Sequence, residues 1–262
     1  MVQFNYIRSM INVVILGGGN VAHHLTTQLL KNDTINLVQV YNRSIEKIQH
    51  LKNSTSITNK LSELKDADIY IISVSDNAIS SLSSKINFKE KLVVHTSGGV
   101  AMKDLLTISN KGVFYLLQSF SKEREVNFST IPICLEAENE KDLKLLSQLA
   151  SKISNTVHII NSEQREKLHL AAVFVNNFVN VMYKIGHDIC NTANVPFEIL
   201  KPLILETASK IDEITPYEAQ TGPARRNDTK TTEKHETMLL INQREIYTLL
   251  TKSINNTYGE KL

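Results

Sequence analysis

The sequence predicts an α/β protein with an N-terminal Rossmann-type, doubly wound, mostly parallel sheet and an all-α C-terminal domain. In the first part of the chain, short apolar runs alternate with helix-type patterns, which is typical of strands buried between two layers of helices. From Ser162 onward the strand signals stop and helical periodicity continues. We therefore expect a domain of residues 1–160 followed by a helical domain of residues 161–262.

A glycine-rich turn follows the first predicted strand. The apolar run from Ile11 to Leu16 leads into three glycines, after which a helix pattern begins. The spacing Gly17-x-Gly19-x-x-Ala22 is that of a dinucleotide-binding turn, in which small residues allow a tight turn, close approach of a pyrophosphate and helix–strand packing. The alternative is a tight turn without a ligand. The residues expected to hold the anion at the helix start are Gly17, Gly19, Asn20, Val21 and Ala22.

The end of the second predicted strand, residues 35–41, indicates which dinucleotide is bound. A site selective for NAD places an acidic residue there to accept hydrogen bonds from the ribose hydroxyls. This chain has Asn42, Arg43 and Ser44 instead, and the Arg43 guanidinium suits a 2′-phosphate. These residues favour NADP. The alternative is that Arg43 is solvated and Ser44 caps a helix over residues 45–51.

Polar residues follow two later strands of the predicted sheet. Ligands of open parallel sheets bind beyond the carboxyl ends of the strands, so Val74, Ser75, His95 and Ser97 are expected beside the nicotinamide. Ser97 and Gly98 are also candidates for substrate binding. His95 is either a proton donor or substrate ligand, or a side chain that ties two loops together. The elements expected after the second strand are strands at 67–75, 91–95, 113–120, 131–135 and 157–160, a helix from Ala78 capped by Asp76, and a helix at 141–153.

A long helix opens the C-terminal domain, with Ser162 as its expected N-cap and an end near Asn191. At about 100° per residue, four polar side chains fall within roughly 20° of one line along this otherwise apolar helix; they are His169, Asn176, Asn180 and His187. A polar stripe on a buried helix needs partners. We expect it to line a wet cleft or to meet a neighbouring helix, in this chain or in a second copy.

A loop rich in turn residues, 221–229, carries two adjacent arginines. Arg225 and Arg226 are candidates for clamping a carboxylate or phosphate, the alternative being that both are solvated. Helices are expected at 197–210, after Asn227 or Asp228, and at 244–255.

Composition excludes several classes of function. The net charge of +2 gives no general reason to expect nucleic acid or a membrane surface as a partner. Cys134 and Cys190 have no metal-type spacing, and no metal is expected. Residues 1–10 are too short and polar for a signal peptide. These features predict a cytoplasmic protein.

Several motifs together resemble one known family. The segments GGGNVA, YNRS, SVSD, HTSGG, LHLAAVFVNNF and TGPARRND resemble the family in which a Rossmann-like domain precedes the domain of unknown function 2520. This family is similar to pyrroline-5-carboxylate reductase, ketopantoate reductase and the deazaflavin-dependent NADP reductases. The resemblance covers essentially the whole chain. It implies a homodimer formed through the C-terminal helices and an active site between domains, with no established substrate.

One departure from related enzymes bears on the chemistry. The β-hydroxyacid dehydrogenases carry Lys-x-x-Asn-Asn where this chain has Val173-Phe-Val-Asn176-Asn177, and a valine cannot transfer a proton. The resemblance therefore implies an NADP-dependent oxidoreductase that acts on a small, anionic imine or carbonyl compound. The expected catalytic residues are His95, His169 and Asn177, and the substrate contacts are expected from Asn176, Asn177, Arg225 and Arg226. The alternatives are a non-catalytic NADP sensor or a dimeric scaffold.

Overall fold

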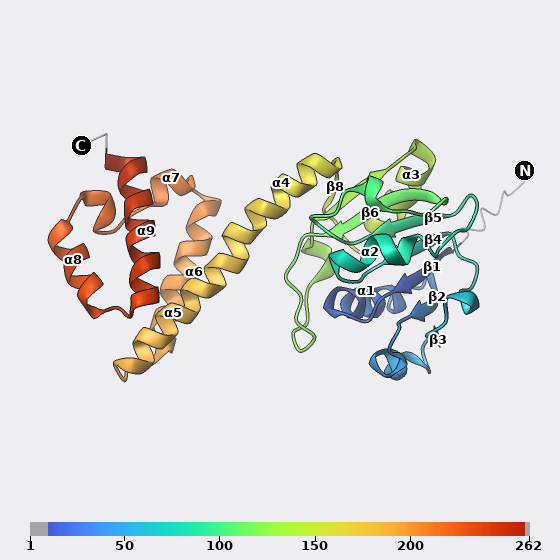
Figure 1. The fold of residues 1–262 in the computed structure, drawn as a ribbon, viewed down its shortest axis with the longest axis horizontal. Coiled ribbons are helices and arrows are strands. Elements are labelled where there is room, and N and C mark those ends of the chain that lie inside the picture. Colours follow the sequence, from blue (N-terminus) through green and yellow to red (C-terminus); the bar gives the residue numbers. More distant parts are fainter. Residues whose placement is uncertain (1–9, 260–262) are drawn as a thin grey trace, which may run out of the picture. The chain divides into compact units, whose positions relative to one another are not determined.

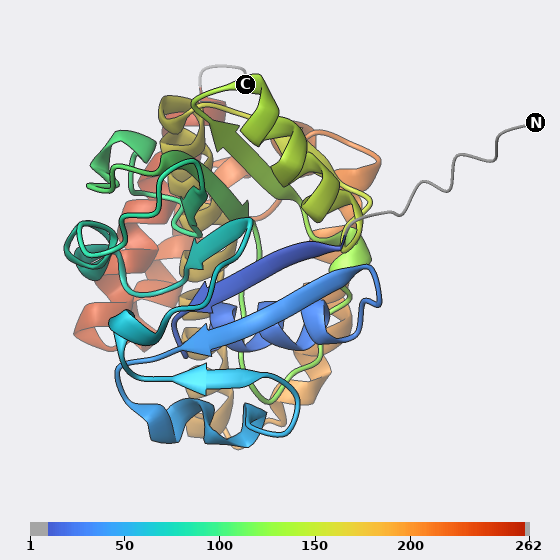
Figure 2. The ribbon, with the colours of Figure 1, turned by 90° about the vertical axis from the view of Figure 1, so that its right-hand side faces the viewer.

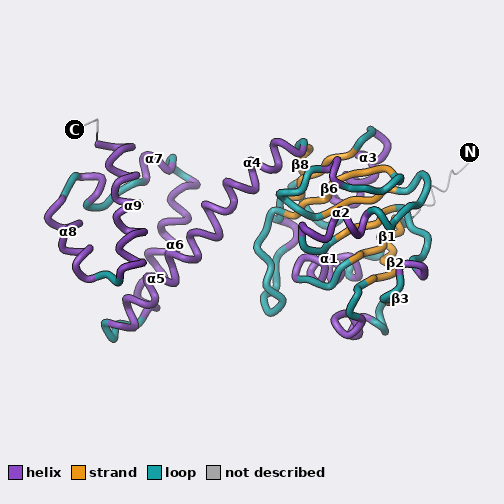
Figure 3. Tube along the Cα trace, in the orientation of Figure 1, coloured by secondary structure: helices purple, strands orange, loops and turns teal. Residues whose placement is uncertain are grey.

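The computed structural model describes residues 10–259 and divides the chain into two compact units, residues 1–176 and 177–262. Nine of the ten residues weighed above as a possible signal peptide lie outside the described part. The first unit holds an eight-stranded sheet and the second is built of helices and loops (Figures 1 and 3). This confirms the predicted fold class. The units meet within a long helical segment, whereas the sequence divides the domains before that segment. The predicted boundary at residue 160 stays a prediction.

The sheet of the first unit has the strand order β3-β2-β1-β4-β5-β6-β7-β8. All neighbouring pairs are parallel except β6 and β7. In Figure 2 the strands β1, β2 and β3 run side by side in blue. The strand bounds are β1 Ile11–Leu16, β2 Ile35–Tyr41, β3 Ser56–Thr58, β4 Ile69–Ile72, β5 Leu92–His95, β6 Asn110–Leu116, β7 Ile133–Ala137 and β8 Val157–Ile159. The short strand β3 is absent from the sequence prediction.

Alternate residues of each strand pack into different cores, as a doubly wound sheet requires. On β1, Val13 and Ile15 belong to one core with Leu25 and Leu29 of α1 (Asn20–Leu30). The helix α3 (Glu140–Ser151) and the 3₁₀ helix η1 (Ile45–Leu51) add to the same core. Val14 and Leu16 face the opposite core, which includes Ile79 of α2 (Asp76–Ser83). The continuous apolar runs in the sequence follow from this coverage of both faces.

The element starts differ from the sequence prediction at two polar residues. The helix α2 begins at Asp76 itself, so Asp76 is a first-turn acid and not the cap of a helix that begins at Ala78. The helix α4 (Ser162–Ala172) has Asn161 as its N-cap, with a reciprocal capping box to Gln164. Ser162 is therefore not the N-cap. Its hydroxyl binds the Glu136 carboxylate instead, at 2.7 Å.

The long helical segment also differs from the prediction in its winding. Between α4 and α5 (Val179–Thr192), the residues Val173–Phe178 form a π-helix. A π turn takes more residues than an α turn, so the projection at about 100° per residue does not continue past Ala172. The single polar line from His169 through Asn176 and Asn180 to His187 is therefore wrong.

The second unit contains short helices joined by tight turns. Its further elements are η6 Phe197–Leu200, α6 Lys201–Ser209, η7 Lys210–Asp212, α7 Pro216–Ala219, η8 Ala224–Arg226, α8 Thr229–Met238 and α9 Ile241–Tyr258. Asp228 caps α8 by accepting from the Thr231 N–H, as one of the two alternatives predicted. Few side chains of this unit are buried; Ala224, Thr232 and Gln243 are those below a tenth exposed among its described residues.

The glycine turn between β1 and α1 has one position that only glycine can occupy. Gly17 has φ +149°, and a Cβ built on it would lie 1.9 Å from the Ser73 carbonyl oxygen. Its N–H donates to the Tyr41 carbonyl at 2.8 Å, so the turn is held between the ends of β2 and β4. Gly19 differs, because a Cβ there would meet nothing within 4 Å.

We expect Gly17→Ala to lower the free energy of unfolding by at least about 2 kcal/mol, because a Cβ clashes with backbone that cannot move aside. Gly19→Ala, the matched control two residues away in the same turn, should change it by less than about 1 kcal/mol. Urea unfolding followed by circular dichroism measures both. Equal losses for the two variants would contradict the assigned turn geometry.

Candidate functional site

The glycine turn leaves the start of α1 free to bind an anion. Gly19 and Asn20 are exposed, Ala22 is buried, and α1 has neither a side-chain cap nor an acidic residue in its first turn. The first N–H groups of a helix have no intrahelical partners, and their dipoles favour negative charge. The Asn20 amide donates to the Phe120 carbonyl at 2.9 Å, which ties the loop after β6 to this helix start. The turn therefore presents unpaired backbone donors beside open space.

The residues after β2 contain a free cation and no carboxylate. Asn42 donates to the Ser44 carbonyl at 2.7 Å, and its side chain borders Gly18. Ser44 precedes η1 without making a side-chain cap. Arg43 is exposed and makes no hydrogen bond or ion pair with any residue between 10 and 259. These are the features that recognise a 2′-phosphate in preference to a bare ribose.

The loop after β5 is shaped by Ser97 and Gly98. The Ser97 hydroxyl accepts the N–H groups of Gly99 and Val100, each at 3.1 Å, so its side chain holds the loop closed. Ser97 and Gly98 are buried, whereas Val74 is half-buried and Ser75 is exposed at the end of β4. Of these candidates, Val74 and Ser75 offer the accessible side chains.

His95, at the end of β5, is fully buried and neutral. Its side chain is 0% exposed, and Nδ1 accepts the Ser97 N–H at 3.1 Å. Burial, with a smaller contribution from the Arg165 charge, lowers the pKa of His95 to about 3. The hydrogen bond joins His95 to a residue two positions on, so it holds the loop after β5 and does not by itself connect two separate segments. Its predicted role as proton donor gains no support from this geometry.

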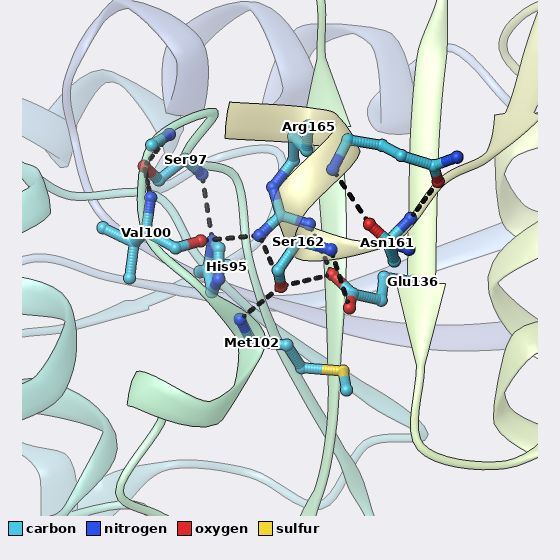
Figure 4. Close-up of polar contacts among 10 residues, drawn as sticks. His95, Ser97, Val100, Met102, Glu136, Asn161, Ser162 and Arg165 are labelled. Carbon is cyan, nitrogen blue, oxygen red and sulfur yellow. Dashed lines mark hydrogen bonds and ion pairs between the residues drawn. The ribbon is translucent and has the colours of Figure 1, made fainter. Parts of the chain in front are cut away.

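Arg165 of α4 joins three segments inside the first unit (Figure 4). Its guanidinium is 1% exposed; Nη1 pairs with the Glu136 carboxylate of β7, and Nη2 donates to the Val100 carbonyl at 2.6 Å. The Ser162 hydroxyl bridges the same carboxylate and the Met102 N–H. Removing one partner of a buried ion pair costs about 3–5 kcal/mol, because the other charge is left unpaired. This cluster fixes the start of α4 against the sheet.

His169, about one turn along α4 from Arg165, meets Tyr115 of β6. The Tyr115 hydroxyl and His169 Nδ1 are 3.2 Å apart. A Cβ on Gly98 would lie 2.6 Å from His169 Nδ1 and 2.8 Å from the Tyr115 ring, so the absence of a side chain at Gly98 permits this pair. His169 also borders Gly99, as does the Asp76 carboxylate. The structure therefore joins His169, Gly98 and a tyrosine that the sequence analysis did not name.

Burial raises the pKa of Tyr115 above its ordinary value, with the nearby Cys134 contributing and Arg165 opposing. Tyr115 therefore keeps its hydroxyl proton at neutral pH. A Tyr115 hydroxyl that donates to His169 Nδ1 selects the imidazole tautomer with its hydrogen on Nε2. Among the hydrogen bonds of residues 10–259, the His169 ring takes part only through Nδ1. The pair can supply a proton to a molecule bound beside it.

The remaining candidates are distributed over both units. Asn176 is exposed at the end of the first unit, and Asn177 is exposed at the start of the second. Within the second unit, Arg225 donates to the carbonyls of Glu218 and Gln220 and lies over the Tyr258 ring at 5.1 Å. Arg226 is exposed; its backbone N–H donates to the Pro223 carbonyl at 3.1 Å, while its guanidinium makes no hydrogen bond with a described residue and, after the Thr231 hydrogen bonds, helps to lower the pKa of Asp228. Of the two arginines, Arg226 is the one with free donors.

Sequence reasoning missed Tyr115, Glu136 and Arg165. Tyr115 lies inside an apolar strand, where a tyrosine is an ordinary core residue. Arg165 could have been noticed in the sequence. It stands three positions after Ser162, where a capping box would have Glu or Gln. Among the described residues, no three His, Cys, Asp or Glu side chains form a group that could hold a metal ion. No helix within 10–259 is both long and apolar enough to cross a membrane.

We predict that His95 makes the folded chain sensitive to acid. Below pH 6.5 the unfolded chain binds a proton that the folded chain, with its His95 pKa of about 3, does not. The stability is complete above pH 6.5 and falls as the pH decreases from 6.5 towards 3. Between pH 7 and pH 5 the loss from His95 is about 2 kcal/mol. His95→Asn keeps an acceptor for Ser97 and should remove this loss, as urea unfolding at both pH values measures.

The exposed His158 of β8 provides the control, because His158→Asn should leave the pH dependence unchanged. If wild type and His95→Asn lose the same stability between pH 7 and pH 5, His95 is not a buried neutral histidine.

Comparison with known proteins places the chain in a family. A family model described as NADP oxidoreductase, coenzyme F420-dependent, matches residues 12–99, and the model of the domain of unknown function 2520 matches residues 131–254. The crystal structure of a "putative NADP oxidoreductase" from Bacteroides fragilis is 38% identical, with TM-score 0.88, and the match covers 95% of this chain and 99% of that chain. No curated protein matches the chain.

More distant structures share the fold. A pyrroline-5-carboxylate reductase from Coxiella burnetii is 19% identical with TM-score 0.58, over 96% of this chain and 98% of that chain. An imine reductase from Myxococcus stipitatus, solved in complex with NADP⁺, is 11% identical with TM-score 0.65, over 95% of this chain and 93% of that chain. With both family models and the 38% identical relative in agreement, the chain belongs to the family of NADP-dependent oxidoreductases that carry the domain of unknown function 2520 after a Rossmann domain.

Proposed function

We propose that this chain transfers a hydride from NADPH to a small, anionic imine or carbonyl compound, and that Tyr115 and His169 supply the proton. The observation that carries the proposal is the 3.2 Å pairing of Tyr115 Oη with His169 Nδ1 beside Gly98. This pair lies at the β5–β6 side of the sheet, near the loop ends where ligands of such folds bind. The distant imine reductase and pyrroline-5-carboxylate reductase structures add support from fold likeness.

The proposed cofactor site combines the exposed, uncapped start of α1 with the unpaired side chain of Arg43. We assign the pyrophosphate to the start of α1, through Gly17, Gly19, Asn20, Val21 and Ala22. We assign the adenosine 2′-phosphate to Asn42, Arg43 and Ser44, and the nicotinamide to the surroundings of Val74, Ser75 and Ser97. The exposed, unpaired Arg43 supports the 2′-phosphate assignment, since an arginine fork binds phosphate through paired hydrogen bonds.

When bound, NADPH supplies the hydride that adds to the carbon of the C=N or C=O bond. The nitrogen or oxygen of that bond must then gain a proton. In the proposed step His169 Nε2–H gives its proton to that atom while the Tyr115 hydroxyl proton moves to His169 Nδ1, so the imidazole keeps one proton and Tyr115 is afterwards reprotonated from solvent. An imine that arrives already protonated needs only orientation by the same pair. His95, buried beneath the Ser97 loop, positions that loop.

Substrate binding draws on the candidates with free polar groups. Asn176 at the end of the first unit, and Asn177 and Arg226 in the second, have exposed side chains, and the Arg226 guanidinium makes no hydrogen bond with a described residue. A carboxylate on the substrate would satisfy that guanidinium. Arg225 has a weaker case than Arg226, because two backbone carbonyls and the Tyr258 ring already occupy its guanidinium.

A second copy of the chain is proposed as the partner of the helical unit. Large apolar side chains are exposed there, including Leu205 at 70% and Ile241 at 78%. The described part of that unit buries few side chains, so little apolar burial offsets the conformational entropy that the unit loses on folding. Obligate dimers bury apolar surface of this kind between their subunits.

A panel of small imines and oxo acids tests the proposed reaction. We expect NADPH-dependent reduction of at least one anionic cyclic imine or oxo acid, which is measured as the loss of NADPH absorbance. Tyr115→Phe and His169→Ala should each lower kcat about 10²–10⁴-fold, because each removes part of the proton supply, while binding of NADPH is retained. His187→Ala, at an exposed histidine of the second unit, is the control and should keep full activity.

Unchanged turnover in both Tyr115→Phe and His169→Ala would exclude the pair as the proton source. Tight NADPH binding without turnover of any compound would favour the non-catalytic sensor.

Charged substitutions on the helical unit test whether it binds a second copy of the chain. Sedimentation velocity should give a dimer for the wild-type chain. Leu205→Arg or Ile241→Arg should raise its dissociation constant about 30-fold or more, because a buried apolar contact is replaced by an unpaired charge. Ile108→Arg, at an equally exposed apolar residue of the first unit, should leave the mass unchanged. A wild-type monomer at micromolar concentration would refute the assignment.

A further inference from the structure

The Asp76 carboxylate lies close to His169, and the proposed reaction does not yet use it. A Cβ built on Gly99 would lie 3.7 Å from Asp76 Oδ2 and 3.8 Å from His169 Cδ2, the ring carbon bonded to Nε2. Asp76 belongs to the first turn of α2 and His169 to the last turn of α4, both in the first unit. Two elements therefore bring a carboxylate and an imidazole to one point. We call the space beside Gly99, bordered by these two side chains, the Gly99 gap.

The carboxylate of Asp76 has free acceptor oxygens. Its side chain is exposed and makes no hydrogen bond or ion pair with residues 10–259. The position suits an acid, because the dipole at the start of a helix favours negative charge. That dipole does not occupy the carboxylate oxygens, which stay available to accept hydrogen bonds. A cation that enters the Gly99 gap would meet this carboxylate on one side and the His169 ring on the other.

The fold does not require a glycine at position 99. Gly99 lacks the positive φ that favours glycine, and its Cβ would make only ordinary van der Waals contacts. Gly98 is different, since a Cβ there would lie 2.6 Å from His169 Nδ1. Gly99 is exposed and His169 is half-buried, whereas Gly98 is buried. The Gly99 gap is therefore accessible, and the missing side chain at position 99 leaves room for a small molecule between Asp76 and His169.

The two kinds of bond that the proposed reaction could reduce differ in the charge beside the carbon that accepts hydride. A C=N bond accepts hydride most readily when its nitrogen is protonated and positive, and its π pair then becomes the nitrogen lone pair. In a C=O bond the same pair moves to oxygen, which becomes negative until it gains a proton. A carboxylate next to the reacting bond stabilises the positive nitrogen and opposes the negative oxygen.

We propose that Asp76 selects imines over carbonyl compounds, because its carboxylate pairs with the positive charge of a protonated C=N nitrogen in the Gly99 gap. The inference rests on the proposed function, since it takes the Tyr115–His169 pair as the source of the proton. His169 Nε2–H gives its proton to the imine nitrogen, hydride from NADPH forms the new C–H bond, and the products are an amine and NADP⁺. The substrate class is thereby narrowed to imines.

Binding of small ring compounds to the complex of the full chain with NADPH tests this charge preference without turnover. Isothermal titration calorimetry compares pyrrolidine, a cation at neutral pH, with cyclopentanol, a neutral compound of similar size. We expect the wild type to bind pyrrolidine about tenfold or more tightly than cyclopentanol, because a hydrogen bond between two charged groups is stronger than one between neutral groups. Asp76→Asn should remove this preference, and Asp76→Glu, which keeps the charge, should retain most of it.

Two further variants separate the Gly99 gap from the helix start. Glu140→Gln is the matched control, because Glu140 is also an exposed acid in the first turn of a helix, α3, and does not border Gly99. It should leave the preference for pyrrolidine unchanged. Gly99→Ala places a Cβ between Asp76 and His169 without a clash. It should weaken pyrrolidine binding about tenfold and leave the midpoint of urea unfolding close to that of the wild type.

Turnover gives a second readout. Asp76→Asn should lower kcat/KM for an imine that the wild type reduces by about tenfold or more, and should leave kcat/KM for a carbonyl compound unchanged or raised. Equal affinity of the wild type for pyrrolidine and cyclopentanol, failure to bind either included, overturns this inference, as does a preference that persists in Asp76→Asn. The proposed function then still stands if the wild type binds NADPH and reduces a compound of the panel. Absence of NADPH binding by the wild type rejects the proposed function itself.

Discussion

The buried guanidinium of Arg165 is the contact on which the arrangement of the candidate site depends. It connects α4 to the sheet through Glu136 and to the loop after β5 through the Val100 carbonyl. The attraction between two buried charges offsets the free-energy cost of their desolvation only when the geometry is good and the remaining hydrogen bonds are made. The Ser162 hydroxyl provides one of these bonds, to the same carboxylate. Because α4 is fixed there, His169 lies over Gly98 and beside Tyr115, and the polar chemistry of the site follows.

Much of the fold could be predicted from the sequence, because each buried strand is a short apolar run with covered faces. The second strand was predicted with its observed bounds, Ile35–Tyr41. The apolar pattern could not predict that β7 runs antiparallel to β6, because strand direction does not change that pattern. It also could not predict the short edge strand β3. The π-helix at Val173–Phe178 also escaped a projection that assumes one helical period. Each of these features is decided by tertiary packing.

The two halves of the candidate site differed in how well the sequence could indicate them. The cofactor half depends on backbone, and its signals are local: a glycine turn with φ +149° at Gly17 and a cation after β2. The chemical half depends on side chains that are 54 residues apart in the chain, Tyr115 and His169. The sequence indicated His169 but not Tyr115, because a strand tyrosine looks like an ordinary core residue. Only the fold shows that Gly98 leaves them the room to meet.

The most direct test of this account is a crystal structure of the chain with NADP⁺ and a bound imine or amine product. We predict the pyrophosphate on the start of α1 and the nicotinamide near Ser75 and the Ser97 loop. The nitrogen of the bound product should lie within hydrogen-bond reach, about 2.6–3.2 Å, of His169 or Tyr115. A dinucleotide bound away from the glycine turn, or a product whose nitrogen faces other residues, would contradict the account.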